Sequence, residues 1–358
     1  MNYAYWLANI PGIGNRTIQR LLAQAGSARE LYFLEEKGLR ALKGFREKEI
    51  RAIVESRGKE TEPAYQTMLA KGISFLSYED DDYPEKLRNI PDAPYGLYIR
   101  GRLPENRKKT VAIVGARRCS EYGRAVARRL GERLAKCGVC VVSGLAVGID
   151  SAGHRGALKG GGMTCAVLGC GVDLCYPVSN RELYYDVLEE GGIVSEYSPG
   201  TQPLPGFFPA RNRIIAGLSD VVVVVEAKSR SGSLITADHA LEQGREIYAV
   251  PGRMDDVLSA GCNMLIRQGA GMIVSVEDFL KELSSGTFPG TCPDSFEKLL
   301  LEKEEYLVYS CVDLRPKTVE ELLLETKLSM PELAAALFAL MRRGFITETF
   351  KNCYIRRL

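Results

Sequence analysis

The chain has 358 residues, and at about 150 residues per domain this length predicts two or three domains. Hydrophobic residues make up 46% and charged residues 26%, which excludes a mostly disordered or collagen-like chain. The 47 basic and 45 acidic residues leave a net charge of +2, so any site for a polyanion such as nucleic acid has to be local.

The sequence shows no segment that would place the protein in a membrane or outside the cell. No apolar run approaches the roughly 20 residues that cross a bilayer. The first residues, Met1–Trp6, lack the basic and apolar sections of a signal peptide. We therefore expect a cytoplasmic protein that makes no membrane contact.

Residues 1–65 have the pattern of a small helical domain. An apolar stretch ends at Pro11-Gly-Ile-Gly14, apolar residues then resume at helical spacing, and the pattern recurs weakly around Gly44. Paired glycines in such a turn favour a helix-hairpin-helix (SAM-like) domain, because the turn aims backbone N–H groups at a phosphate. A plain helical bundle with glycine turns explains the same residues, so the sequence leaves DNA contact by this segment open.

Residues 66–284 have the pattern of a Rossmann-like domain, with a proline-punctuated leading part up to about residue 110. Short, almost continuous apolar runs then alternate with helical stretches, which is typical of parallel strands covered by helices on both faces. We predict an α/β fold with a mainly parallel sheet. The predicted strands are 111–114, 139–142, 164–168, 193–194, 221–225, 247–250 and 272–274.

A linker rich in turn-forming residues follows at 285–294 and separates a compact tail, 295–358. Helices are predicted at 299–308, 318–325 and 329–342, and two short strands at 345–348 and 353–355. Three helices and a terminal hairpin indicate a winged-helix domain. Its third helix is poor in base-reading side chains before Arg342, so a protein-contact role is as well supported as duplex DNA binding.

The loops that follow the predicted strands carry small residues, hydroxyls and arginines. Ligands of an open parallel sheet bind at the carboxyl ends of its strands, and this composition is typical of a phosphate-binding surface. Each glycine alone is explained by a tight turn and each arginine by a salt bridge, but their conjunction favours a site. The candidate residues are Gly115, Arg117, Arg118, Ser120, Ser143, Gly144, Gly148, Gly169, Gly171, Phe208, Arg211, Asn212, Arg213, Ser231 and Gly232.

Two further groups of polar residues have alternative interpretations. The predicted helix after Ser120 carries Arg124, Arg128, Arg129 and Arg133, which form either a positive track beside the loops or an ordinary solvated face. Asp150 and His154 stand four residues apart at a helix start, where capping and a structural hydrogen bond explain them better than acid–base chemistry.

The motifs of common enzymes and metal sites are missing. The sequence has no G-x-x-x-x-G-K-[ST] motif for nucleotide hydrolysis and no G-x-G-x-x-G after the first strand. It also has no G-x-S-x-G and no H-E-x-x-H. The single C-x-x-C, Cys137–Cys140, has neither a second such pair nor a histidine cluster to complete a zinc site. We therefore expect no cofactor, no metal and no catalytic residues.

The central part of the chain resembles the bacterial DNA-processing protein A family, also called DprA or Smf. The similarity covers about residues 90–275 in the order of the family. The matching stretches are Ile113–Gly123, Val142–Asp150, Gly169–Gly171 with Tyr176-Pro177 and Asn180, Phe208–Ser219, Ser231–Ala237 and Gly261–Asn263.

The resemblance implies a non-enzymatic protein that binds and protects single-stranded DNA and helps to load the RecA recombinase. It implies a positive pocket at the carboxyl edge of the sheet, with Arg117 as a principal contact and Gly115, Ser143, Gly144, Phe208, Arg211, Asn212 and Arg213 nearby. It also implies a homodimer through this domain, with Pro251–Gly271 as a candidate interface. Either natural transformation or general recombination fits such a role.

Two departures from the family pattern stand in the pocket motifs. Some members carry a lysine just before the Phe-Pro pair, whereas this chain reads Pro203-Leu-Pro-Gly-Phe207, and Ala116 replaces a frequent hydroxyl residue. Two alternative functions are a nucleotide N-glycosidase of the lysine-decarboxylase-like phosphoribohydrolase type and a winged-helix transcription regulator. The glycosidase loop Pro-Gly-Gly-x-Gly-Thr is replaced here by Ser231–Thr236, which argues against the first.

Overall fold

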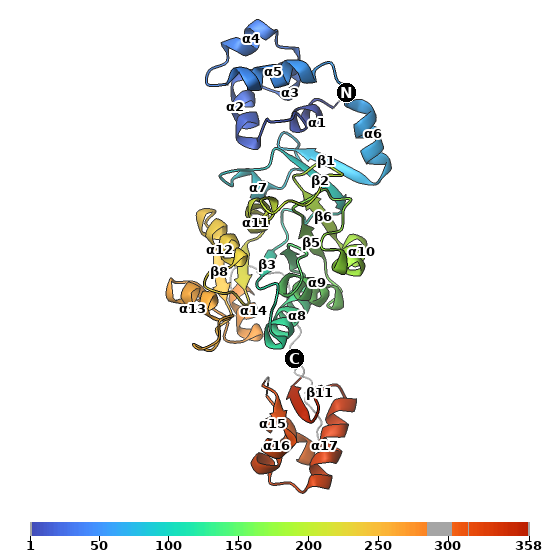
Figure 1. Cartoon of the computed structure of the whole chain (residues 1–358), viewed down its shortest axis with the longest axis vertical. Coiled ribbons are helices and arrows are strands. Elements are labelled where there is room, and N and C mark those ends of the chain that lie inside the picture. The colour runs from blue at the N-terminus through green and yellow to red at the C-terminus, as the bar shows by residue number, and fades with distance from the viewer. Residues whose placement is uncertain (1, 285–302, 314, 357–358) are drawn as a thin grey trace. The chain divides into compact units, whose positions relative to one another are not determined.

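The computed structural model describes residues 2–284, 303–313 and 315–356. The chain divides into two compact units, Met1–Gly290 and Thr291–Leu358. In Figure 1 the first unit runs from blue to orange and the second is red. The predicted linker, 285–294, and the first part of the predicted tail, 295–302, lie outside the described residues.

A nine-stranded sheet forms the centre of the first unit (Figure 1). Its order is β1-β2-β6-β5-β4-β3-β7-β8-β9; all neighbours from β6 to β9 are parallel, whereas β1–β2 and β2–β6 are antiparallel. The predicted α/β class with a mainly parallel sheet is confirmed. The strands are β1 (Ile73–Ser77), β2 (Gly96–Gly101), β3 (Thr110–Val114), β4 (Cys140–Ser143), β5 (Thr164–Val167), β6 (Gly192–Ser195), β7 (Val221–Val224), β8 (Glu246–Ala249) and β9 (Gly271–Met272).

Helices cover both faces of this sheet, which explains why its strands are apolar without alternation. Successive residues of β3 enter opposite cores: Ala112 and Val114 pack with α11 and α12, while Val111 and Ile113 pack with α8, α9 and α14. The helices of this part are α7 (Glu85–Arg88), α8 (Glu121–Lys136), α9 (Ile149–Lys159), α10 (Arg181–Glu190), α11 (Phe207–Gly217), α12 (Gly232–Glu242), α13 (Ala260–Arg267) and α14 (Val276–Ser284), with a 3₁₀ turn at Val178–Asn180.

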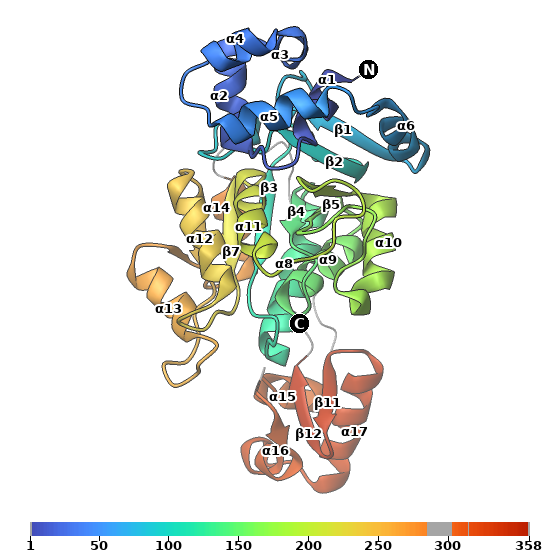
Figure 2. The same ribbon diagram turned by 45° about the horizontal axis from the view of Figure 1, so that its top comes forward.

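The first helices form a separate core next to the β1–β2 end of the sheet, as both Figure 1 and Figure 2 show. The single tryptophan, Trp6, packs there with residues of α2, α3, α4 and α5, and Tyr95 joins them from the segment before β2. The helices are α1 (Tyr3–Ala8), α2 (Asn15–Ala25), α3 (Ala28–Phe33), α4 (Glu36–Ala41), α5 (Glu47–Ser56) and α6 (Glu62–Ala70). We call α1–α5 the N-terminal helical segment. Its first turn uses Gly12 at φ +82°, a conformation that glycine adopts without strain.

The described part of the tail, 303–313 and 315–356, contains three helices and a three-stranded sheet. Its elements are α15 (Lys303–Cys311), β10 (Lys317–Thr318), α16 (Val319–Thr326), α17 (Met330–Arg342), β11 (Ile346–Phe350) and β12 (Cys353–Arg356), and the sheet order is β10-β12-β11. Thr318 and Ser329 cap α16 and α17 as residues of capping boxes, which explains where both helices begin. A compact core around Leu322, Leu333 and Leu340 holds the tail together.

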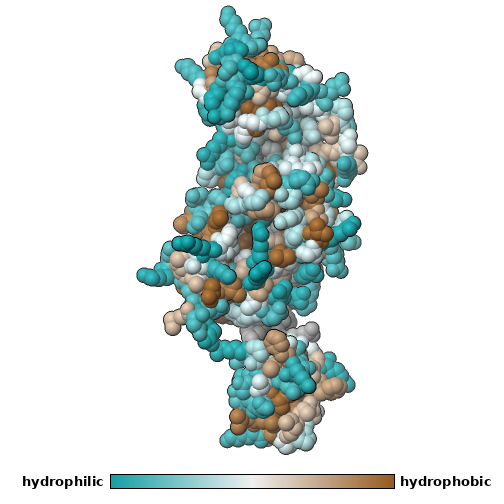
Figure 3. All heavy atoms as spheres, in the orientation of Figure 1, coloured by the Kyte–Doolittle hydropathy of each residue, from teal (hydrophilic) through white to brown (hydrophobic). Residues whose placement is uncertain are grey.

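Hydrophilic residues predominate on the face of the molecule that Figure 3 shows. Figure 3 shows hydrophobic residues on one face as scattered patches rather than as a continuous area. Within the described residues, none of the helices combines the length and the hydropathy needed to span a bilayer.

Candidate functional site

A pocket of about 570 Å³ opens at the carboxyl edge of the sheet, beside the point where the strand order reverses between β3 and β7. This is the place where open α/β sheets bind their ligands. The loops after β3, β4, β5 and β7 and one side of α11 line it. Seven of the predicted site residues lie in its wall: Gly115, Arg117, Phe208, Arg211, Asn212, Ser231 and Gly232.

Arg117 is an exposed cation at this pocket. Among the described residues it forms no ion pair, and its guanidinium carbon lies 5.6 Å from the centre of the Phe208 ring. Phe208 in turn stacks on Tyr176, with ring centroids 5.3 Å apart and planes 28° from parallel. A guanidinium over stacked rings provides both a charge for a phosphate and a flat apolar surface for a base.

Another part of the pocket wall is the N-terminal end of α12. Ser231 caps this helix and accepts a hydrogen bond from the backbone N–H of Ser233. Asn212 of α11 donates to the carbonyl of Gly232 at 3.2 Å, which joins the two helices across the pocket. No atom lies within 4 Å of the position that a Cβ on Gly232 would take, so the helix end is open to a ligand. The positive end of the helix dipole favours an anion there.

Arg211 also lines the pocket but is only 4% exposed. Its Nη1 donates to the carbonyl of Gly144 at 2.9 Å and to the carbonyl of Val167, so it ties the ends of β4 and β5 together. Burial lowers the pKa of Arg211 to about 10, with Asp150 opposing that shift, so the side chain keeps its charge at neutral pH. Its Nε has no hydrogen-bond partner in the described structure.

Asp150 and His154 act as structural groups in this arrangement. Asp150 lies at the pocket and accepts from the N–H of Gly144 at 3.1 Å, and burial raises its pKa against the influence of Arg211. His154 is fully buried, pairs with the Thr164 hydroxyl at 2.6 Å, and has its pKa lowered by burial to about 3. Since no hydrogen bond between the two side chains is present in the described structure, their geometry favours the structural interpretation.

Several predicted residues support the pocket from outside its wall. Ser143 is buried and donates to the carbonyl of Ile113 at 2.6 Å, which joins β4 to β3. Ser120 caps α8 and donates to the Glu226 carboxylate, which holds the first loop against the end of β7. Both hydroxyls therefore donate hydrogen bonds within the protein.

The predicted glycines outside the wall are explained by close backbone approaches. Gly148 has φ +86°, and a Cβ there would meet the carbonyl of Ala116 at 2.3 Å. A Cβ on Gly144 would collide with the Arg211 guanidinium, one on Gly169 would press on Phe208, and one on Gly171 would meet the N–H of Gly200. Gly148 and Gly171 thus let one loop pack against another, while Gly144 and Gly169 let their loops pack against α11.

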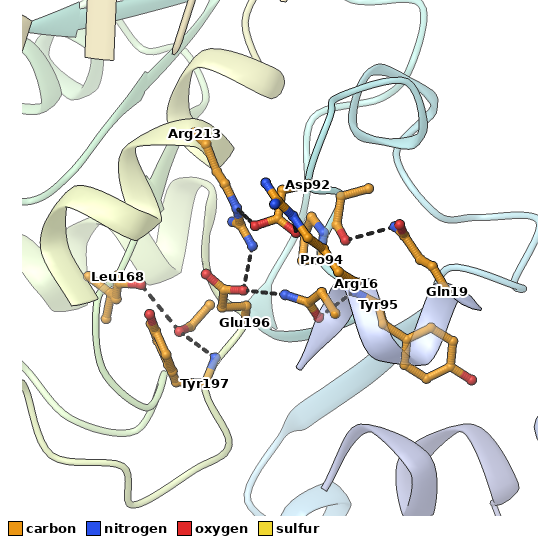
Figure 4. Close-up of polar contacts among 12 residues, drawn as sticks. Arg16, Gln19, Asp92, Pro94, Tyr95, Leu168, Glu196, Tyr197 and Arg213 are labelled. Atoms are coloured by element: carbon orange, nitrogen blue, oxygen red, sulfur yellow. Dashed lines mark hydrogen bonds and ion pairs between the residues drawn. The ribbon is translucent and has the colours of Figure 1, made fainter. Parts of the chain in front are cut away.

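Two predicted arginines do not reach the pocket wall. Arg118 is exposed next to Arg117 but does not line the cavity. Arg213 is 7% exposed and does not line the cavity; it points toward Glu196 and Asp92 (Figure 4). Because α11 turns by about 100° per residue, Arg213 takes a different side of the helix from Asn212.

Among the lining residues absent from the predicted set, two are exposed and carry an aromatic ring or a charge. Tyr176, after β5, and Arg230, after β7, both border the pocket and are exposed. An aromatic or a basic residue in a loop after a strand was the available indication for both.

On α8, Arg124 pairs with Glu121 at 3.3 Å and Arg129 with Glu277 at 2.8 Å, which favours the solvated face for these two side chains. In the described residues, no three His, Cys, Asp or Glu side chains gather as metal ligands do.

Comparison with known proteins agrees with this architecture. Residues 74–284 match the family described as DNA recombination-mediator protein A. DNA processing protein DprA of Streptococcus pneumoniae is 47% identical over 207 residues, or 58% of this chain and 73% of that protein. Protein Smf of Synechocystis is 39% identical over 289 residues, or 79% of this chain and 73% of that protein.

Solved structures show the same relation. The structure of DNA processing protein A from Streptococcus pneumoniae superposes with a TM-score of 0.68 at 36% identity, covering 79% of this chain and 98% of that one. The Helicobacter pylori protein, described with a single-stranded DNA binding mode, gives a TM-score of 0.55 at 31% identity, covering 60% and 97%. The chain therefore belongs to the DNA recombination-mediator protein A family.

Proposed function

We propose that this protein binds single-stranded DNA in the pocket at the carboxyl edge of its sheet, without catalysing a reaction. The observation that carries the proposal is Arg117, an exposed arginine without an ion pair among the described residues, placed over the Phe208–Tyr176 stack. Unselective single-strand binders combine positive charge for the backbone with aromatic rings for the bases. The single-stranded DNA binding mode of the Helicobacter pylori relative supports the assignment.

The binding would serve DNA recombination, with the protein protecting single strands and helping to load RecA in the cytoplasm, in natural transformation or in general recombination. A net charge of +2 fits modest affinity per protomer, so tight binding would depend on several protomers. We propose a homodimer that uses the region 251–271. This region and the residues just after it carry exposed apolar side chains, namely Met254, Val257, Met264, Met272 and Val274. The strand β9, which contains Met272, is an edge strand of the sheet.

We further propose that the chain comprises a helix-hairpin-helix (SAM-like) domain at 1–65, the Rossmann-like DNA-binding domain at 66–284, a linker at 285–294 and a winged-helix domain at 295–358. The element order of the tail, with three helices followed by the β11–β12 hairpin, supports the last assignment. The exposed side chains of Met330 and Phe338 on α17 favour a protein partner for the tail over base reading.

The test is fluorescence anisotropy of a labelled oligo-dT, with an equally long duplex as competitor. We expect salt-sensitive binding of oligo-dT that the duplex does not displace. Arg117→Ala should weaken the affinity for oligo-dT about tenfold or more, because it removes a charge-assisted contact. Arg107→Ala is the matched control, because Arg107 is exposed and precedes β3, at the opposite edge of the sheet. Equal affinity of the Arg117 and Arg107 variants for oligo-dT would show that the DNA-binding site is not at Arg117.

The alternative functions predict different results in the same experiment. Displacement by duplex would support transcriptional regulation through the tail. Release of free base from nucleoside monophosphates would support a nucleotide N-glycosidase and contradict a purely binding role.

A further inference from the structure

A buried ion-pair cluster lies at α11, outside the pocket wall. Arg213 Nη2 contacts Glu196 Oε2 at 2.6 Å, and its Nε lies 3.5 Å from Asp92 Oδ2. The Arg213 and Glu196 side chains are 8% and 10% exposed, so their charges are largely removed from water. A buried pair of this kind is stabilising only when its geometry is kept, since either partner alone is strongly unfavourable.

The same carboxylates hold the N-terminal helical segment. Asn15, the first residue of α2, donates from Nδ2 to Glu196 Oε2 at 2.9 Å and accepts the Tyr95 N–H at Oδ1 at 3.0 Å. Arg16 lies 3.5 Å from Asp92, and Gln19 donates to the carbonyl of Ala93 at 3.3 Å. Figure 4 shows Glu196 between Arg213 of α11 on one side and α2 on the other.

Glu196 also adjoins the aromatic residues next to the pocket. It directly follows β6, and the ring of the next residue, Tyr197, stacks on Phe207 with centroids 4.1 Å apart. Phe207 precedes Phe208, an aromatic residue of the pocket wall. Glu196 therefore contacts Asn15 of α2 and Arg213 of α11, and its neighbour Tyr197 stacks on α11. Neither Glu196 nor Arg213 lines the pocket.

We propose that Glu196 and Arg213 are positioning residues that couple the docking of the N-terminal helical segment to the DNA pocket. With α2 docked, the cluster holds α11 in place, and with it Phe208 and Asn212. This inference rests on the proposed single-stranded DNA binding. Coupling between two sites is reciprocal, so bound DNA has to stabilise the docking of α2 by the same factor by which docking strengthens DNA binding.

The experiment compares three variants of the full chain. Glu196→Gln keeps the size of the side chain but removes its charge, and Asn15→Ala removes the contact from the α2 side. Glu79→Gln is the control, because Glu79 meets the same helical segment, accepting from the Ala28 N–H at 3.4 Å and the Tyr95 hydroxyl at 2.9 Å, without a described hydrogen bond to α11. Anisotropy with oligo-dT measures affinity, and amide hydrogen exchange with and without oligo-dT measures the protection of α2.

We expect Glu196→Gln and Asn15→Ala to bind oligo-dT about fivefold or more weakly, at the lower end of typical coupling. Oligo-dT should slow hydrogen exchange in α2 of the parent and of Glu79→Gln, and this protection should disappear in the other two variants. A merely structural role would not produce DNA-dependent protection of a helix outside the pocket. If Glu196→Gln fails to fold, as circular dichroism would show, Asn15→Ala decides alone.

Unchanged affinity in the folded variants, or an equal loss in Glu79→Gln, would overturn the coupling while leaving the pocket assignment intact. Absence of oligo-dT binding by the parent protein would instead overturn the proposed function itself, and the coupling with it.

Discussion

The first loop, after β3, and helix α11 both bring arginines to the carboxyl edge of the sheet, but they use them in opposite ways. In the first loop, Arg117 is exposed, has no ion pair within the described structure and lies over an aromatic ring. On α11, Arg211 and Arg213 are 4% and 7% exposed, and both have partners within the protein. An arginine in a phosphate-binding pattern is thus available to a ligand only where the fold leaves it without a carboxylate or carbonyl partner.

Removing one arginine of each kind should affect folding very differently. Arg213→Ala should lower the free energy of unfolding by about 3–5 kcal/mol, because it leaves the Glu196 carboxylate buried without its ion-pair partner. Arg117→Ala should change it by no more than about 0.5 kcal/mol, as expected of an exposed side chain. Urea unfolding followed by circular dichroism measures both. Similar losses for the two variants would show that burial does not separate the roles of these arginines.

The aromatic partner of Arg117 offers a second, smaller contrast. Phe208→Ala should weaken oligo-dT binding by about 1–3 kcal/mol, the usual effect of losing one stacking ring, while Phe208→Tyr should keep most of the affinity. Tyr185→Ala is the control, because Tyr185 is an exposed aromatic residue of α10 that does not line the pocket. If Phe208→Ala binds as tightly as Tyr185→Ala in anisotropy titrations, bases do not stack on the Phe208–Tyr176 pair.

Much of the fold could be predicted because the chemistry of parallel strands is local. The run Val221–Val224 is buried on both faces, so its lack of alternation already indicates a strand between helix layers. The strands β1 and β2 were not predicted. They form an antiparallel pair at the other end of the sheet, where glycine, proline and acidic residues interrupt the pattern and tertiary packing against the N-terminal helices decides the structure.

The site was predictable as a set of loops but not as a set of contacts. That the loops after β3, β5 and β7 meet follows from the topology of parallel sheets, and the structure brings them to one cavity. Which side chains face that cavity depends on helix phase and on long-range partners. Arg213 is drawn to carboxylates from Asp92 and Glu196, and Tyr176 reaches the pocket through stacking on Phe208. The spacing of residues in the sequence predicts neither of these contacts.

The smallest expected effect concerns how Arg117 contacts DNA. A guanidinium that neutralises a phosphate releases about one counterion, so Arg117→Ala should make the slope of log K against log salt less steep by about 0.7 for a single strand. If the guanidinium only stacks on a base, Arg117→Ala would reduce the affinity for DNA and leave this slope unchanged. Anisotropy titrations of oligo-dT at four or more salt concentrations separate the two contacts, with Arg107→Ala as the charge-matched reference. Because Arg117 has no described carboxylate partner and lines the same pocket as the N-terminal end of α12, we expect the change in slope.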